Sequence, residues 1–131
     1  MAQDGSPPAL RDPAERALDE LILAVRARAR TEGKVLSAFP GLWFFRFDRP
    51  QPPMAGLQPS MYLGVALQGK KRIETKSATL TYDRRRYFVI RGEQRYTAAV
   101  VEATPARPYL AVGVQLPPSL VVQTLLALGE V

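Results

Sequence analysis

The chain contains no cysteine and no histidine among its 131 residues. Without cysteine it can form neither a disulfide nor a thiolate zinc site, and it has no thiol nucleophile. Without histidine it lacks the most common general acid and base, and with it any catalytic triad built around an imidazole. These two absences argue against an enzyme, and we expect no catalytic residues and no cofactor.

The chain also lacks a long apolar run. No stretch approaches the roughly 18 residues that cross a membrane, and the N-terminus has neither the basic nor the apolar part of a signal peptide. We therefore expect a cytoplasmic protein with no membrane partner. The length suits one domain. We assign residues 12–131 to it and residues 1–11, which are polar and without period, to a disordered leader.

An amphipathic helix is predicted for residues 13–32. Asp12 can cap its N-terminus, Pro13 suits its first position, and apolar residues follow at helical spacing. Acidic residues come early and arginines late, which suits the helix dipole, and Gly33 can end the helix. Such a helix lays one apolar stripe on a neighbouring surface.

Short strands follow, separated by turn residues. Because proline cannot donate to a strand ladder, we assign the proline-rich stretch 48–60 to a loop. Gly69 and Lys70 indicate a hairpin turn. The strands have no helix between them, which predicts a mainly β barrel or sandwich and not an α/β fold. The predicted strands cover residues 42–47, 61–68, 71–75, 79–82, 86–90, 96–102 and 109–116.

The last predicted helix, residues 119–128, is apolar on nearly every side. Its sequence indicates a buried helix, yet little chain follows that could cover it. Either it pairs with a second copy of the chain, or the natural protein continues past Val131. For a homodimer, the predicted contact residues are Leu120, Val121, Leu125 and Leu128.

Other catalytic and metal-binding patterns are also missing from the sequence. The serines have no histidine partner and no nucleophile elbow, no glycine-rich loop precedes a helix, and no acidic stretch has the spacing of a calcium loop. We expect no metal site. A metal-free isomerase that works through Glu74 or Glu102 is the enzyme hypothesis that stays open.

Basic residues give the one electrostatic signal, with 18 lysines and arginines against 12 acids and a net charge of +6. Two basic triplets flank predicted turns: Lys70, Lys71 and Arg72, and Arg84, Arg85 and Arg86. With the aromatic residues nearby they could bind a single-stranded nucleic acid, or they could be solvated hairpin ends. A stand-alone basic β-domain that binds nucleic acid is therefore the alternative function.

Alternation along the strands indicates how the interior is built. Residues 61–67 and 109–116 place large apolar side chains on one face and small residues on the other, and the aromatic residues of 42–47 alternate likewise. An interior lined by the large side chains is either a solid core or a site for one small apolar or aromatic ligand. The predicted ligand-lining residues are Trp43, Phe45, Leu63, Val65, Phe88, Leu110 and Val112.

Several short motifs occur in order along the chain. They are FPGLWFFR at 39–46, PPM at 52–54, LGVALQGKKR at 63–72, YD at 82–83, RYFVI at 86–90, VEATPARPYLA at 101–111 and LPPSLV at 116–121. This series resembles the N-terminal domain of AraC-type transcriptional regulators over residues 18–128. The chain departs from the family at Arg84 and Arg85, where a glycine usually follows the Tyr-Asp pair, and at Lys76 and Ser77, which replace a common Gly-Asp or Gly-Glu.

The resemblance implies a fold and a function. It implies a cupin-like β-barrel of the jelly-roll type, flanked by the N-terminal amphipathic helix and the C-terminal helix. Such a domain binds a small organic effector, forms a homodimer and controls a C-terminal pair of helix-turn-helix units, which would enter successive major grooves of DNA and are absent from this chain. Effector binding would change how the leader or a terminal helix docks.

Overall fold

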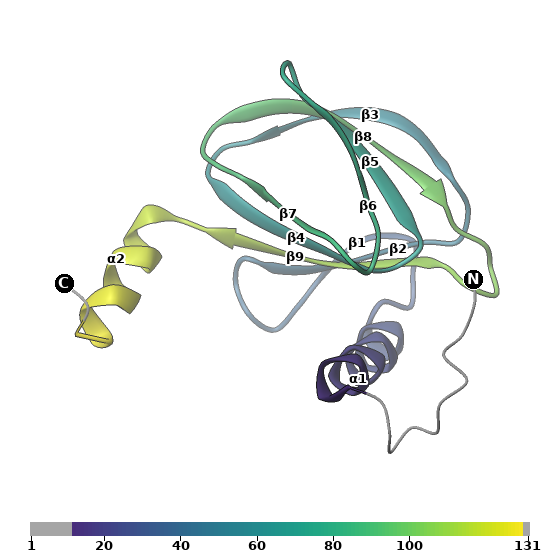
Figure 1. Ribbon diagram of the computed structural model, residues 1–131, viewed down its shortest axis with the longest axis horizontal. Coiled ribbons are helices and arrows are strands. Elements are labelled where there is room, and N and C mark those ends of the chain that lie inside the picture. Colours follow the sequence, from purple (N-terminus) through teal and green to yellow (C-terminus); the bar gives the residue numbers. More distant parts are fainter. Residues whose placement is uncertain (1–11, 130–131) are drawn as a thin grey trace.

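The computed structural model describes residues 12–129 and shows two antiparallel sheets that face each other (Figure 1). The elements are α1 (Pro13–Arg28), β1 (Gly33–Leu36), β2 (Leu42–Phe47), β3 (Gln51–Gln58), β4 (Met61–Gln68), β5 (Lys70–Glu74), β6 (Thr79–Tyr82), β7 (Tyr87–Ile90), β8 (Gln94–Glu102), β9 (Tyr109–Leu116) and α2 (Pro118–Ala127). One sheet has the order β1-β2-β9-β4-β7 and the other β3-β8-β5-β6. Within the described range no strand of one sheet pairs with a strand of the other. The sheets therefore form a sandwich, one of the two architectures that the strand pattern predicts, and they do not close into the β-barrel that the resemblance implies.

The predicted mainly β fold with a helix near each end is confirmed. Four strands, β2, β4, β6 and β9, begin and end at the predicted residues. The cap is also as predicted, because the Asp12 carboxylate accepts a hydrogen bond from the Ala14 N–H at 3.0 Å. However, α1 ends at Arg28 and not at residue 32, since Gly33, at φ 102°, already begins β1, a strand that we did not predict. The predicted leader, residues 1–11, lies outside the described residues.

Strand β3 corrects the assignment of residues 48–60 to a loop. It lies at the edge of the four-stranded sheet and pairs only with β8. Pro52 and Pro53 fall where the register shifts between Gln51 and Met54, so they interrupt the ladder without ending the strand. An edge strand with a bulge tolerates prolines that a central strand would exclude, which is why composition alone was misleading here.

Helix α1 covers the outer face of the five-stranded sheet (Figure 1). Val25 of the helix and Ala29, the residue directly after it, are fully buried there, each at most 1% exposed. They pack in one apolar cluster with three side chains from the outer face of the sheet: Phe44, Leu67 and Leu110. The apolar stripe that the sequence predicts on this helix thus forms a core outside the sandwich, separate from the side chains between the sheets.

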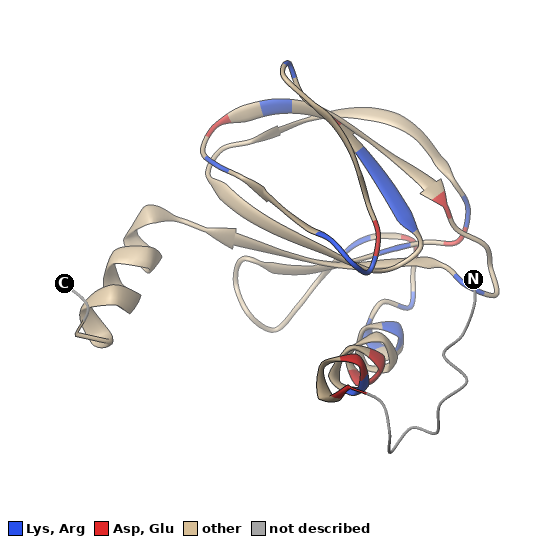
Figure 2. Cartoon of the chain, in the orientation of Figure 1, with Lys and Arg blue, Asp and Glu red and all other residues tan. Residues whose placement is uncertain are grey.

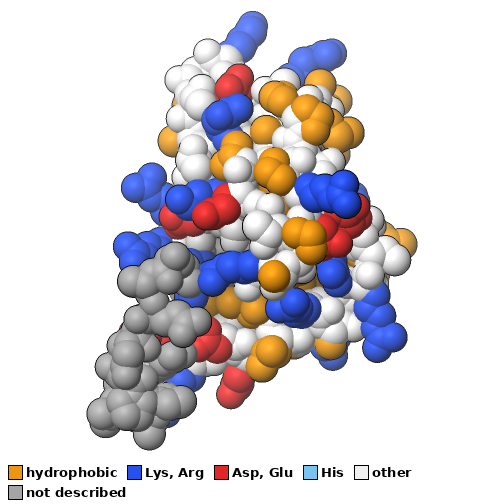
Figure 3. All heavy atoms as spheres, turned by 90° about the vertical axis from the view of Figure 1, so that its right-hand side faces the viewer, with side chains coloured by type: hydrophobic (Ala, Val, Ile, Leu, Met, Phe, Trp, Pro, Cys, Tyr) orange, Lys and Arg blue, Asp and Glu red, His pale blue; other side chains and the backbone are white. Residues whose placement is uncertain are grey.

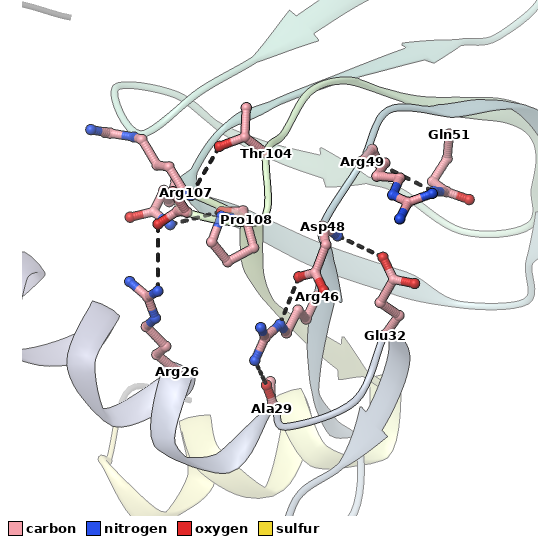
Figure 4. Close-up of polar contacts among 12 residues, drawn as sticks. Arg26, Ala29, Glu32, Arg46, Asp48, Arg49, Gln51, Thr104, Arg107 and Pro108 are labelled. Carbon is pink, nitrogen blue, oxygen red and sulfur yellow. Dashed lines mark hydrogen bonds and ion pairs between the residues drawn. The ribbon is translucent and has the colours of Figure 1, made fainter.

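Polar contacts fasten the end of α1 to the strands beside it (Figure 4). The Arg46 guanidinium on β2 donates from Nε to the Asp48 carboxylate at 2.9 Å and from Nη1 to the Ala29 carbonyl at 3.1 Å. The Glu32 carboxylate accepts a hydrogen bond from the backbone N–H of Asp48 at 2.7 Å. These contacts fix the direction in which the chain leaves the helix and enters the sheet.

Candidate ligand site between the sheets

The side chains that point between the sheets are mostly aromatic. One buried cluster joins Tyr62, Phe88 and Ile90 of the five-stranded sheet to Ile73 and Tyr82 of the four-stranded sheet. Residues from both sheets meet in it, so it marks the inner face of the sandwich. Side chains that share this inner face by strand alternation and cluster membership include Trp43, Phe45, Phe47, Ala66, Tyr96, Ala98, Val100, Tyr109 and Ala111.

Two glycines make room for these rings. Gly64 on β4 and Gly113 on β9 are directly paired across the two strands. A Cβ at Gly64 would overlap the ring of Phe88, and a Cβ at Gly113 would overlap the hydroxyl of Tyr62. The glycine pair is therefore a depression in the inner face that aromatic side chains occupy. Three rings lie in a row over this depression. The ring centroids are 6.4 Å apart for Trp43 and Tyr62, and 5.9 Å apart for Tyr62 and Phe88.

Lys71 places an ammonium group against this aromatic face. On β5 it pairs with Tyr82 on one side and Val100 on the other, both inward-facing, and it stands two residues before buried Ile73. Its Nζ lies 5.5 Å from the ring centre of Phe45 and 5.7 Å from that of Phe88, both on the opposite sheet. Burial lowers the pKa of Lys71 to about 8, because a charged amine is poorly solvated there.

A second lysine lies on the same face near the open edge formed by β1. Lys34 pairs with Phe45 across the ladder, and its Nζ lies 3.9 Å from the ring centre of Trp43. Cation–π contacts of this kind contribute about 0.5–1 kcal/mol at exposed sites. Among the residues that the structure describes, no carboxylate forms an ion pair with Lys34 or Lys71.

Two tyrosine hydroxyls are also buried on the inner face. Tyr62 is 5% exposed and Tyr109 is 1% exposed. Burial raises the pKa of both phenols above their usual range, and a neighbouring phenol raises each further: Tyr96 for Tyr62, and Tyr62 for Tyr109. Neither hydroxyl has a hydrogen-bond partner among residues 12–129. Because buried polar groups are normally hydrogen-bonded, both are available as neutral donors to a guest.

The sandwich is open beside the turn that joins β6 to β7. A cavity of about 450 Å³ lies along these two edge strands, and the inward-facing rings of Tyr82 and Phe88, whose centroids are 4.6 Å apart, form part of its wall. Arg85 and Arg86 also line it. A second cavity of about 290 Å³ lies beyond the same turn, against the outward-facing Leu63 and Val65. No acidic side chain lines either cavity.

A comparison with models of protein families identifies the family of this chain. Residues 38–130, more than half of the chain, match the model described as AraC-type transcriptional regulator N-terminus. The chain belongs to this family. A comparison with curated protein sequences finds no match.

Solved structures resemble the two-sheet fold of this AraC-type N-terminal domain at low identity. Drosophila melanogaster CENP-C bound to CAL1 is 13% identical with a TM-score of 0.51, covering 80% of this chain and 100% of that one. The Schizosaccharomyces pombe Cnp3 cupin domain is 13% identical with a TM-score of 0.44, covering 65% and 59%. A cupin-2 domain protein from Shewanella frigidimarina is 8% identical with a TM-score of 0.40, covering 63% and 78%.

In this AraC-type domain the predicted ligand-lining residues divide between two faces. Trp43, Phe45 and Phe88 do point between the sheets. The placement in the interior is wrong for the other four, because they lie on the outer face of the five-stranded sheet, where α1 or the β6–β7 turn covers them: Leu63, Val65, Leu110 and Val112. Whether any of the seven residues contacts a ligand stays a prediction.

The error has a physical source. On β4 and β9 we took the face with the large aliphatic side chains as the interior, but that face packs against α1. The interior face carries glycine and alanine, since the bulk there comes from aromatic rings of neighbouring strands. Sequence reasoning missed Lys34, Lys71, Tyr62 and Tyr109. The available signal was the in-phase alternation of Lys71 with Ile73.

Helix α2 of the domain continues from β9 through Pro117 and projects away from the sandwich (Figure 1). None of its residues is buried, and it carries no charged residue (Figure 2). The predicted dimer residues are all exposed: Leu120 by 43%, Val121 by 36%, Leu125 by 38% and Leu128 by 67%. Neither α1 nor α2 is long and apolar enough to span a membrane.

The basic triplets do not form continuous patches. Lys70 lies 4.0 Å from Glu102 and Arg72 lies 3.6 Å from Glu74, whereas Lys71 between them points inward. Arg84 forms an ion pair with Asp19 of α1 at 3.7 Å. On the face shown in Figure 3, lysines and arginines stand apart, with acidic and apolar side chains between them. The described residues contain no group of three acidic side chains that could hold a metal.

Proposed function

We propose that this chain is the effector-sensing and dimerisation domain of an AraC-type transcription regulator. It takes a small organic effector between its two sheets, and the bound effector controls DNA binding by the C-terminal helix-turn-helix domain of the regulator. The observation that carries the proposal is an inner face with aromatic walls and with ammonium and hydroxyl groups that have no acceptor among the described residues. A face that served only as a core would carry apolar side chains at the positions of Lys34 and Lys71 as well.

Strand β9 supplies a route from such a site to the rest of the regulator. Its inner face carries Tyr109, Ala111 and Gly113, and its end leads through Pro117 directly into α2. An effector that contacts these residues differently in two arrangements of the domain would change the position of α2. Because α2 exposes an uncharged apolar surface, a second copy of the chain covers it in this proposal.

The sole tryptophan gives a direct test. Trp43 lies on the inner face, 6.4 Å from the Tyr62 ring, so a compound that binds between the sheets changes its fluorescence. We expect at least one compound from a panel of neutral and charged small molecules to change this emission and to raise the melting temperature. Trp43→Phe should remove the optical signal and keep the thermal one. If no compound changes either quantity, the sensing role is wrong.

A further inference from the structure

Lys71 is a charged residue whose side chain points between the two sheets. The ladder forces it inward, because its partners Tyr82 and Val100 both point between the sheets. Lysine is rarely placed inside a protein unless its charge has a partner. Its Nζ lies over the rings of Phe45 and Phe88 on the other sheet.

The acids that could neutralise Lys71 are engaged elsewhere. Glu74 on β5 pairs with Arg72, and Glu102 on β8 pairs with Lys70, both away from the inner face. Within residues 12–129 no hydrogen bond or ion pair to Lys71 is present. The inner face therefore has an uncompensated positive charge.

Two tyrosines, Tyr62 and Tyr109, bring further hydrogen-bond donors to the same inner face. The Tyr62 ring lies 5.9 Å from Phe88, and Tyr109 packs in the cluster that includes Phe45. Lys71 lies against both of these phenylalanines. One ammonium group and two buried tyrosines, whose hydroxyls have no acceptor within residues 12–129, thus share the aromatic inner face of the sandwich. The guest that satisfies them carries acceptor oxygens and a negative charge, and it has a flat apolar body.

We propose that the site between the sheets takes an aromatic carboxylate, and that Lys71 binds its carboxylate group. This proposal rests on the proposed function, since it names the class of effector. The other ammonium of this face, Lys34, lies over Trp43 at the edge formed by β1, so Lys71 alone lies against Phe45 and Phe88. One ammonium matches the single charge of a carboxylate, whereas a phosphate dianion would need a second charge or a row of backbone N–H groups beside it. The cavity at the β6–β7 edge, about 450 Å³, is within the size range of small-molecule sites. Lys71 does not line it, but two of its lining residues adjoin Lys71: Tyr82 is the ladder partner of Lys71, and the Phe88 ring lies under its Nζ.

The test compares acids with their neutral amides. Benzoate, cinnamate and indole-3-acetate are titrated by calorimetry against benzamide, cinnamamide and indole-3-acetamide. We expect at least one acid to bind the native domain about 10- to 100-fold more tightly than its amide. Lys71→Met should remove that preference, and Lys71→Gln should weaken it. Lys70→Met, next in sequence but on the outer face, should leave it unchanged. Circular dichroism and the melting temperature show that each variant is folded.

Each other outcome overturns a defined statement. If the amides bind as tightly as the acids, the carboxylate is not recognised, while the proposed sensing function stands. If Lys71→Met keeps the preference and Arg85→Gln loses it, the anion binds at the rim of the cavity and not at Lys71. If neither acids nor amides bind, the aromatic carboxylate class is wrong, and the fluorescence panel with Trp43 then decides on the sensing function separately.

Discussion

Lys71 differs from both of its sequence neighbours. Lys70 and Arg72 reach solvent and acidic partners, whereas Lys71 points between the sheets. A run of three basic residues therefore contains two kinds of cation, because successive side chains of a strand face opposite ways. Sequence alone gives the alternation but not which side is the interior. Only the inward placement of Ile73 and Tyr82 on the same face settles that question.

The charge of Lys71 gives the domain a pH-dependent stability. Burial lowers its pKa from 10.5 to about 8, so between these values the unfolded chain binds more protons than the folded one. The stability of the native domain therefore rises with pH through this window, and the charged form is a cost below pH 8. We expect Lys71→Met to stabilise the ligand-free domain by about 1–3 kcal/mol at pH 7, and the gain to shrink toward pH 10.5.

Urea unfolding at pH 7, 8.5 and 10 measures this gain. The matched control is Lys70→Met, which removes an exposed charge from the same strand and should show no comparable trend with pH. A gain for Lys71→Met that is the same at all three values would contradict a lowered pKa for Lys71.

At the scale of the elements, strands with strong alternation were predictable, the edge strand β6 among them, whereas the edge strands β1 and β3 were not. β2, β4, β6 and β9 carry clear patterns and were predicted to the residue. β1 is short, and β3 contains Pro52 and Pro53, so neither has the composition of a strand. Each pairs with one neighbour only, so pairing in the fold and not local preference makes them strands.

The same limit explains why the candidate site was only partly predicted. The amphipathic pattern of α1 predicts a helix that covers a surface, but it does not say which face of which sheet. Since α1 packs on Leu67 and Leu110, the aliphatic residues of β4 and β9 belong to the helix interface. Trp43 and Phe45 of β2 lie on the inner side, where they were expected.

The outer core should respond to truncation as a packed interior does. Leu110 is fully buried against α1, and we expect Leu110→Ala to destabilise the domain by about 2–5 kcal/mol. Leu23→Ala is the matched control, since this leucine of α1 is 68% exposed and its loss should change stability by less than about 0.5 kcal/mol. Chemical denaturation measures both. Equal effects of the two substitutions would mean that α1 is not held on this face.

At the scale of the whole molecule, α2 is an apolar helix that the rest of residues 12–129 leaves uncovered. Pairing of two α2 helices would remove its exposed leucines from water. We therefore expect the native chain to sediment as a dimer and Leu125→Asp to sediment as a monomer, because a buried carboxylate without a partner is strongly unfavourable.

The control for the dimer is Gln123→Asp, which adds the same charge to the same helix at a polar position. It should leave most of the dimer intact. If Leu125→Asp remains a dimer, α2 is not the dimer interface, and the two copies associate through another surface.

The expectation that the chain is not an enzyme stays a prediction.

The two prolines of β3 have a consequence for how copies of the chain meet. An exposed strand edge with a regular row of N–H and C=O groups invites a strand from another molecule, which leads to aggregation. Neither Pro52 nor Pro53 has an N–H group to offer to a neighbouring strand at that edge of the four-stranded sheet. Backbone-to-backbone growth of the sheet is therefore interrupted there, and association between copies at that edge depends on side chains, which can be selected for one partner.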